Sequence, residues 1–243
     1  MAHEPTPLVA VVGATGGAGT SCVAAAAAHG LRRASRRGVL VDLDAAGPGA
    51  EVLLGIEAEP GARWPELSGA RGEVDGGGLV AALPRWGAVP VLSGSRLAPE
   101  APDDDVVLDV CAALLRSGEA VVLDIPRPGA WTPAARALLA DADDVLVATP
   151  LSITGAAGAV ALCGALERMP AGSGAGRVRL VARATRTARV HAQEVEKLTG
   201  LQVAAQVAED RALTAAIERG EGPRVARGTR LGALAGELAR VLR

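Results

Sequence analysis

The chain has 243 residues, of which 49% are hydrophobic and 21% are charged, and its formal net charge at pH 7 is −2. This composition is that of a globular protein and excludes a disordered chain. The small net charge gives no electrostatic footprint for sequence-independent DNA binding, and the absence of Phe and Tyr removes the usual stacking platforms for single-stranded nucleic acid, so we expect no specific nucleic-acid partner.

Short apolar runs recur along the chain and are typical of parallel strands that helices cover on both faces. In chain order they are residues 8–12, 39–43, 89–92, 120–123, 145–148, 178–181 and 203–207. Helix-length stretches lie between most of them, an alanine-rich one after residue 22 and others at 105–116, 132–140, 154–168 and 190–198. The alternation predicts a doubly wound α/β fold, a mostly parallel sheet with helices on both faces.

Two segments lack this pattern. Residues 47–85 are rich in Gly, Pro and Glu, and we expect short helices and loops there, over one edge of the sheet. Residues 170–176 read P-A-G-S-G-A-G, which predicts a surface loop.

The C-terminal stretch, residues 229–243, is amphipathic. Leucines recur in it at helical spacing, at Leu231, Leu234, Leu238 and Leu242. An amphipathic terminal helix can hold a membrane surface or pack on its own domain, and Gly232 and Gly236 weaken this one as an isolated helix. We therefore expect packing on the sheet and no direct membrane contact.

A glycine-rich turn joins the first apolar run to the alanine-rich stretch. Residues 12–22 read V-G-A-T-G-G-A-G-T-S-C. A strand, a glycine loop and a helix N-terminus together form a phosphate-binding device, because free backbone N–H groups and the helix dipole point at an anion.

One interpretation of this turn is a dinucleotide site. Gly13, Gly16 and Gly19 have the spacing G-x-x-G-x-x-G, and the next predicted strand ends in Asp42 and Asp44, about where a ribose-binding carboxylate belongs. The turn resembles the opening of atypical short-chain dehydrogenases, whose chemistry needs a tyrosine that this chain lacks. An NAD(P)-binding protein without dehydrogenase activity remains an alternative.

The other interpretation is a P-loop. Residues 15–21, T-G-G-A-G-T-S, resemble the deviant Walker A loop K-G-G-x-G-K-T of the ParA/MinD superfamily, with Thr15 and Thr20 in place of both lysines. The resemblance implies that the loop binds a nucleotide and that the Ser21 hydroxyl is a Mg²⁺ ligand. The implied nucleotide-binding residues are Gly16, Gly17, Ala18, Gly19, Thr20, Ser21 and Cys22.

Further motifs favour the P-loop. Residues 39–49, V-L-V-D-L-D-A-A-G-P-G, resemble the second motif of that superfamily, and alternation along a strand points the Asp42 and Asp44 carboxylates to one side. Residues 120–127, A-V-V-L-D-I-P-R, resemble its Walker B region. The resemblance implies that Asp42 and Asp124 hold Mg²⁺ through water. Asp44 would position an attacking water, and Arg127 would be the substitute cation if the site is active.

Longer stretches are similar to one branch of that superfamily. D-I-P-R-P-G-A-W-T-P-A-A-R-A-L-L-A-D-A-D-D-V-L-V-A-T-P (124–150) and the tail from E-V-E-K-L-T-G to E-R-G-E-G-P (194–223) resemble CpaE/TadZ proteins of Tad (Flp) pilus assembly. They resemble most the Ssd-type relatives, which are named for septum-site determination. The resemblance implies a single P-loop domain over residues 1–243, without the receiver-like N-terminal domain that many of these proteins carry.

The departures from the pattern weaken the expected nucleotide chemistry. A P-loop lysine donates charge-assisted hydrogen bonds to phosphate, and the loss of one such contact costs about 1.5–3 kcal/mol. Ala182 stands where the family has a base-reading asparagine after the strand predicted to end at residue 181. We therefore expect weak binding of ATP and Mg²⁺ with little or no hydrolysis. An active ATPase that uses Asp44 and Arg127 remains the alternative.

The resemblance also implies partners and a location. We expect a spatial regulator or scaffold that docks on proteins of a pilus, secretion or cell-division apparatus, and a homodimer, if one forms, that does not depend on nucleotide. No signal peptide precedes the first apolar run, and no run is long enough to span a bilayer. We expect a cytoplasmic protein, recruited by a partner to the cell pole, the septum or the inner membrane face.

Overall fold

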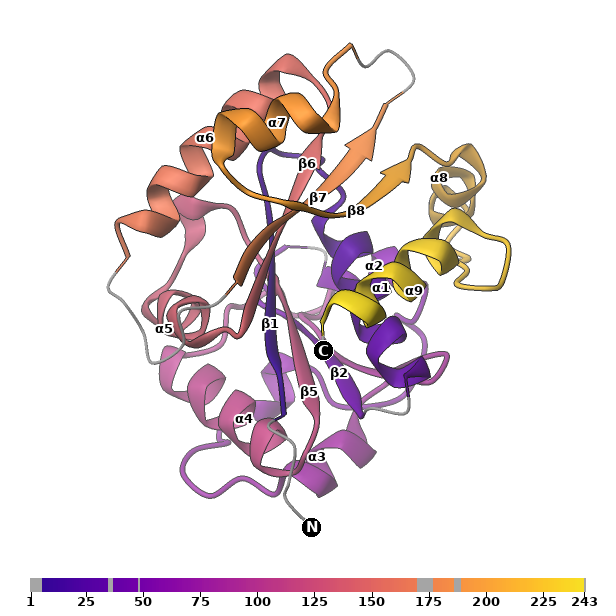
Figure 1. Ribbon diagram of the computed structural model, residues 1–243. Coiled ribbons are helices and arrows are strands. Elements are labelled where there is room, and N and C mark those ends of the chain that lie inside the picture. Colours follow the sequence, from indigo (N-terminus) through magenta and orange to yellow (C-terminus); the bar gives the residue numbers. More distant parts are fainter. Residues whose placement is uncertain (1–5, 35–36, 48, 170–176, 186–188, 243) are drawn as a thin grey trace.

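A computed structural model describes residues 6–34, 37–47, 49–169, 177–185 and 189–242. Figure 1 shows a central sheet that runs through the molecule, with helices on both sides. This arrangement confirms the predicted doubly wound α/β class. The predicted loop at residues 170–176 lies outside the described residues.

The sheet has eight strands in the order β3-β4-β2-β5-β1-β6-β7-β8. The strands are β1 (Leu8–Gly13), β2 (Gly38–Asp42), β3 (Arg85–Trp86), β4 (Val89–Leu92), β5 (Ala120–Ile125), β6 (Asp144–Pro150), β7 (Arg177–Ala184) and β8 (Val203–Ala208). All neighbours pair in parallel except β3 and β4, which form an antiparallel hairpin at the edge. Strand β3 was not predicted, because two residues carry no periodicity.

The strand order separates this fold from the dinucleotide-binding one. In the latter, the first two strands of the chain lie side by side in the order 3-2-1-4-5-6. Here β5 lies between β1 and β2, and β6 lies on the other side of β1. Asp42, which ends β2, and Asp44, which follows it, therefore do not belong to the strand next to β1 and its glycine loop.

Helices cover both faces of this sheet (Figure 1). On one face lie α3 (Gly76–Ala82), α4 (Asp104–Arg116), α5 (Pro133–Asp141), α6 (Ile153–Glu167) and α7 (Ala192–Thr199). On the other lie α1 (Thr20–Arg33), α2 (Gly49–Leu54), α8 (Arg211–Glu218) and α9 (Arg230–Val241). Single 3₁₀ turns occupy Trp64–Leu67 and Pro128–Ala130. Residues 49–84 form the predicted short helices and loops, and residue 85 begins β3.

Two hydrophobic cores lie on the two faces of the sheet. Along β1, Ala10 and Val12 pack into the core under α3 to α7, while Val9 and Val11 pack into the core under α1 and α9. All four side chains are fully buried. The unbroken apolar strand pattern thus reflects burial on both faces.

The C-terminal helix α9 packs on α1 and β8, as predicted. Leu231, Leu234 and Leu238 of this helix are buried, as is Leu242, which directly follows it. Gly30 in α1 allows the close approach, since a Cβ there would collide with the Ala235 carbonyl of α9. The apolar face of α9 is therefore covered by the protein itself. Within the described ranges, no helix has the length and apolar character needed to cross a membrane.

Candidate functional site

The glycine loop links β1 to the first turn of α1 at the carboxyl edge of the sheet. Gly19 precedes the helix with a φ of 84°, a left-handed backbone that glycine adopts without strain. Among the described residues, no side chain caps this first turn. Its N–H groups, together with the helix dipole, are therefore available to an anion.

Two adjoining hollows at this edge bring the predicted site residues together. One, of about 290 Å³, is lined by the loop from Gly16 to Cys22 and by Arg127. The other, of about 420 Å³, is lined by Asp42. Ser21, Asp44 and Asp124 line both hollows. Their volumes are of the size that small-molecule ligands occupy, about 300–1,000 Å³.

Two buried aspartates face each other across neighbouring strands. Asp42 of β2 and Asp124 of β5 are register partners and are 2% and 5% exposed. Burial raises the pKa of Asp42 to about 6, against hydrogen bonds from the Ala50 and Asp44 amides that lower it. Burial, followed by the Asp42 charge, raises the pKa of Asp124 to about 8, while the Ser21 side chain opposes the rise. An ion bound between them would relieve their repulsion, as Mg²⁺ does with carboxylate oxygens.

Asp42 also anchors the chain that follows β2. Its Oδ1 accepts a hydrogen bond from the Asp44 amide at 2.9 Å, and its Oδ2 accepts one from the Ala50 amide at 2.7 Å. The indole of Trp64 donates to the Asp42 carbonyl at 2.7 Å. Asp44 is exposed and lies in the turn beyond the strand. Asp42 therefore sets the position of Asp44 and of the start of α2.

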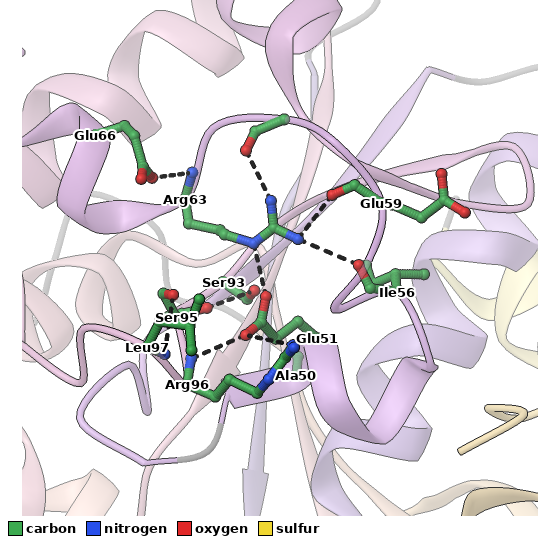
Figure 2. Close-up of polar contacts among 12 residues, drawn as sticks. Ala50, Glu51, Ile56, Glu59, Arg63, Glu66, Ser93, Ser95, Arg96 and Leu97 are labelled. Atoms are coloured by element: carbon green, nitrogen blue, oxygen red, sulfur yellow. Dashed lines mark hydrogen bonds and ion pairs between the residues drawn. The ribbon is translucent and has the colours of Figure 1, made fainter.

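A buried ion pair, which sequence analysis missed, fixes α2 from its other side (Figure 2). The Nε of Arg63 donates to Glu51 at 2.6 Å, and its Nη2 donates to the carbonyls of Ile56 and Glu59 at 3.2 and 3.0 Å. The other oxygen of Glu51 accepts the Arg96 amide at 2.9 Å. Twelve positions separate Glu51 from Arg63 in a segment without periodic pattern, so no sequence signal joined them.

Two arginines approach the glycine loop from opposite sides. Arg127 follows β5 and is exposed, with Nη1 3.7 Å from the position that a Cβ would take on Gly16. Arg183, in β7, donates from Nη2 to the Gly17 carbonyl at 2.9 Å. Arg183 was not predicted as a site residue. The sequence feature that could have indicated it is a charged residue near the carboxyl end of a predicted strand, because open α/β sheets bind their ligands at that edge.

The strand that carries Arg183 is longer than predicted. It runs to Ala184, and Ala182 is a buried core residue inside it rather than a loop residue after it. Because its side chain is buried in the core, position 182 does not face a ligand. A separate hollow of about 420 Å³ lies beyond the ends of β7 and β8 and is lined by residues that include Ala184, Asp210 and Arg230.

No protein-family model matches the sequence. The chain is 35% identical over 215 residues to uncharacterized proteins from two strains of Mycobacterium tuberculosis, which covers 88% of this chain and 57% of theirs. The chain thus spans little more than half the length of these curated relatives.

Solved structures share the fold over nearly their whole length. A ParA family ATPase from Chlorobium tepidum superposes with a TM-score of 0.75 at 17% identity, covering 99% of this chain and 100% of that one. The MinC:MinD cell division complex of Aquifex aeolicus gives 0.73 at 15% identity, with 97% and 95% covered. The septum site-determining protein MinD of Pyrococcus horikoshii, complexed with Mg-ADP, gives 0.72 at 15% identity, with 97% and 95% covered. The chain has the fold of ParA/MinD P-loop ATPases.

Proposed function

We propose that this chain, on its ParA/MinD fold, is a spatial regulator of the CpaE/TadZ/Ssd type. It acts in pilus assembly or in placement of the division site, and its nucleotide site binds ATP and Mg²⁺ weakly and hydrolyses ATP little. One observation carries the proposal. The loop amides and the acidic pair meet at one edge of the sheet, while both lysine positions of the loop, Thr15 and Thr20, carry neutral side chains.

The retained groups support nucleotide binding. Loop amides at the start of α1 suit a phosphate, and Ser21, Asp42 and Asp124 form an oxygen-rich set that suits Mg²⁺. The MinD relative that was solved with Mg-ADP shares this fold. The departure of the strand order from the dinucleotide-binding one argues against the NAD(P) alternative.

The lost groups support slow hydrolysis. Phosphoryl transfer depends on positive charges that stabilise the transition state, and the loop supplies none between residues 13 and 22. A threonine hydroxyl offers one neutral hydrogen bond in place of an ammonium group. A site of this kind can therefore retain nucleotide binding while it loses hydrolysis, and such a protein can serve as a switch or a scaffold.

An apolar groove between α6 and α7 supports docking of a protein partner. Its volume is about 550 Å³, and it is lined by Ile153, Val160 and Leu198 among others. Ile153 is 78% exposed and Leu198 61% exposed. Large apolar side chains gathered on one surface mark interaction sites. Such docking would recruit the protein to the pole, the septum or the inner membrane face.

Restoring the loop lysine tests the nucleotide site. We expect Thr20→Lys to tighten Mg²⁺–ATP binding about tenfold or more, because it adds a charge-assisted phosphate contact. Calorimetric titration of both proteins measures this, and Thr20→Met is the matched control, since it adds length without charge. If a folded Thr20→Lys variant binds no tighter than the parent, the loop is not a P-loop and the nucleotide site is refuted.

The alternatives have separate signatures. Sustained phosphate release that Asp44→Ala abolishes would establish the active ATPase and reject the scaffold. If NAD(P) raised the melting temperature and Mg²⁺–ATP did not, the dinucleotide interpretation would replace ours.

A further inference from the structure

Among the described residues, Arg183 is the basic side chain that hydrogen-bonds to the glycine loop, and it comes from another strand. Arg183 extends from β7, and its Nη2 donates to the Gly17 carbonyl. Its Cδ and Nε lie 3.7 and 4.0 Å from the position that a Cβ would take on Gly19. The guanidinium therefore lies along the loop on the side of β7. Residues 13–22 contribute no basic side chain of their own.

The charge of Arg183 reaches the first turn of α1. Burial raises the pKa of the Cys22 thiol to about 11, the Asp124 charge adds to the rise, and the Arg183 charge opposes it. Cys22 belongs to the helical turn whose amides face the hollow. A positive charge that acts on this turn also acts on an anion bound there.

Arg183 retains hydrogen-bonding capacity for a ligand. Its Nε is buried and has no hydrogen-bond partner within the described part of the chain. A guanidinium has five N–H donors in a planar fork, and the Gly17 carbonyl uses one of them. A buried donor without a partner is costly. Arg183 borders Gly17 and Gly19 but does not line the hollow at the loop, so its side chain would turn toward the hollow to offer this donor to a phosphate oxygen.

Arg127 differs from Arg183 in being unanchored. In the ranges that the structure describes, its guanidinium has no hydrogen-bond or ion-pair partner, and the residue is exposed. A free arginine must lose side-chain freedom to hold a ligand, whereas Arg183 is already held against the loop.

We propose that Arg183 supplies the positive charge that Thr15 and Thr20 do not, and that it holds the phosphate groups of a nucleotide at the loop. This inference rests on the proposed nucleotide site. It makes Arg183 a ligand-binding residue, in the place where sequence analysis had put Arg127.

The test compares Mg²⁺–ATP affinity in the full chain and its variants by calorimetry, with inorganic pyrophosphate as a probe that lacks the nucleoside. Gln removes the charge and keeps an N–H donor on a shorter side chain. We expect Arg183→Gln to weaken both ligands about tenfold and Arg183→Lys to retain most of the affinity. The matched control is Arg85→Gln, which removes an exposed arginine in the edge strand β3 outside both hollows and should change the affinity less than about threefold.

A rescue experiment separates charge from loop architecture. Thr20→Lys is expected to tighten binding in the parent as well, so its gain is compared in the two backgrounds. If Arg183 acts by its charge, Thr20→Lys gains more affinity in Arg183→Gln than in the parent, whereas a loop that has only lost an anchor shows no larger gain. A gain no larger than in the parent, or equal affinity of Arg183→Gln and the parent, overturns the inference and leaves the proposed nucleotide site standing. If the parent binds neither ligand, the proposed site itself is wrong, and the inference fails with it.

Discussion

Replacing Asp124 with asparagine should stabilise the ligand-free protein, and more so as the pH rises. Burial and the neighbouring Asp42 raise the pKa of Asp124 from 3.8 to about 8. Between these two values the folded protein keeps a proton on Asp124 that the unfolded chain releases. Stability is therefore lost as the pH climbs through this window. Asparagine has nearly the shape of the protonated aspartate and does not ionise, so the variant does not lose stability at this position as the pH rises.

The size of the effect follows from the two pKa values. Each pKa unit is worth about 1.4 kcal/mol, so a carboxyl whose pKa is raised by several units costs the parent on the order of a few kcal/mol of unfolding free energy once the pH has risen through this window. Asp124→Asn should thus gain on the order of a few kcal/mol on the parent between pH 5 and pH 8. The pKa of Asp42 is also raised, to about 6, so its ionisation lowers the stability of the parent in the same pH direction. Part of the gain in Asp124→Asn therefore comes from removing the repulsion between the two carboxylates.

Urea denaturation of both proteins at pH 5 and pH 8 measures the difference directly. Glu73→Gln, which removes an exposed carboxylate away from the site, is the control and should show no growing gain. Saturating Mg²⁺–ATP should shrink the gain, because a metal favours the ionised carboxylate. A difference between Asp124→Asn and the parent that stays flat from pH 5 to pH 8 would refute the reasoning.

Two further predictions concern stability. Leu238→Ala, in the fully buried face of α9, should lower the unfolding free energy by about 2–5 kcal/mol in urea titrations. The control Leu97→Ala, at a side chain that is 83% exposed, should change the unfolding free energy by less than about 0.5 kcal/mol. Equal effects of the two variants would mean that α9 does not pack on α1. Arg63→Met should cost about 3–5 kcal/mol, because it removes the buried cation at 2.6 Å from Glu51 and leaves only the half-exposed Arg96 side chain at 4.0 Å. In a double-mutant cycle, Glu51→Leu with Arg63→Met should lose less than the sum of the single changes, and simple additivity would count against the buried pair.

Much of the architecture is local and could be predicted from sequence. Apolar runs without alternation indicate strands covered on both faces, and the strand, glycine loop and helix pattern at residues 8–33 indicates an anion site by itself. The sequence also predicted Asp42 and Asp124 as site residues, because each comes at the end of an apolar run and the carboxyl ends of parallel strands lie at one edge of the sheet. The leucine spacing of α9 indicated which face is buried, and the fold confirms it.

Contacts between distant segments could not be predicted from the sequence. Nothing local pairs Glu51 with Arg63, joins Arg183 to Gly17 across 166 positions, or marks the two-residue strand β3. Strand periodicity says which residues are buried but not which strands are neighbours, so the dinucleotide and P-loop interpretations both fitted the glycine spacing. The sequence by itself determined the strand–loop–helix unit and the acidic strand ends, because these depend on near neighbours in the chain. Only the tertiary structure decided that β5 lies between β1 and β2 and that a cation reaches the loop from β7, because strand order and long-range contacts follow from how the whole chain packs.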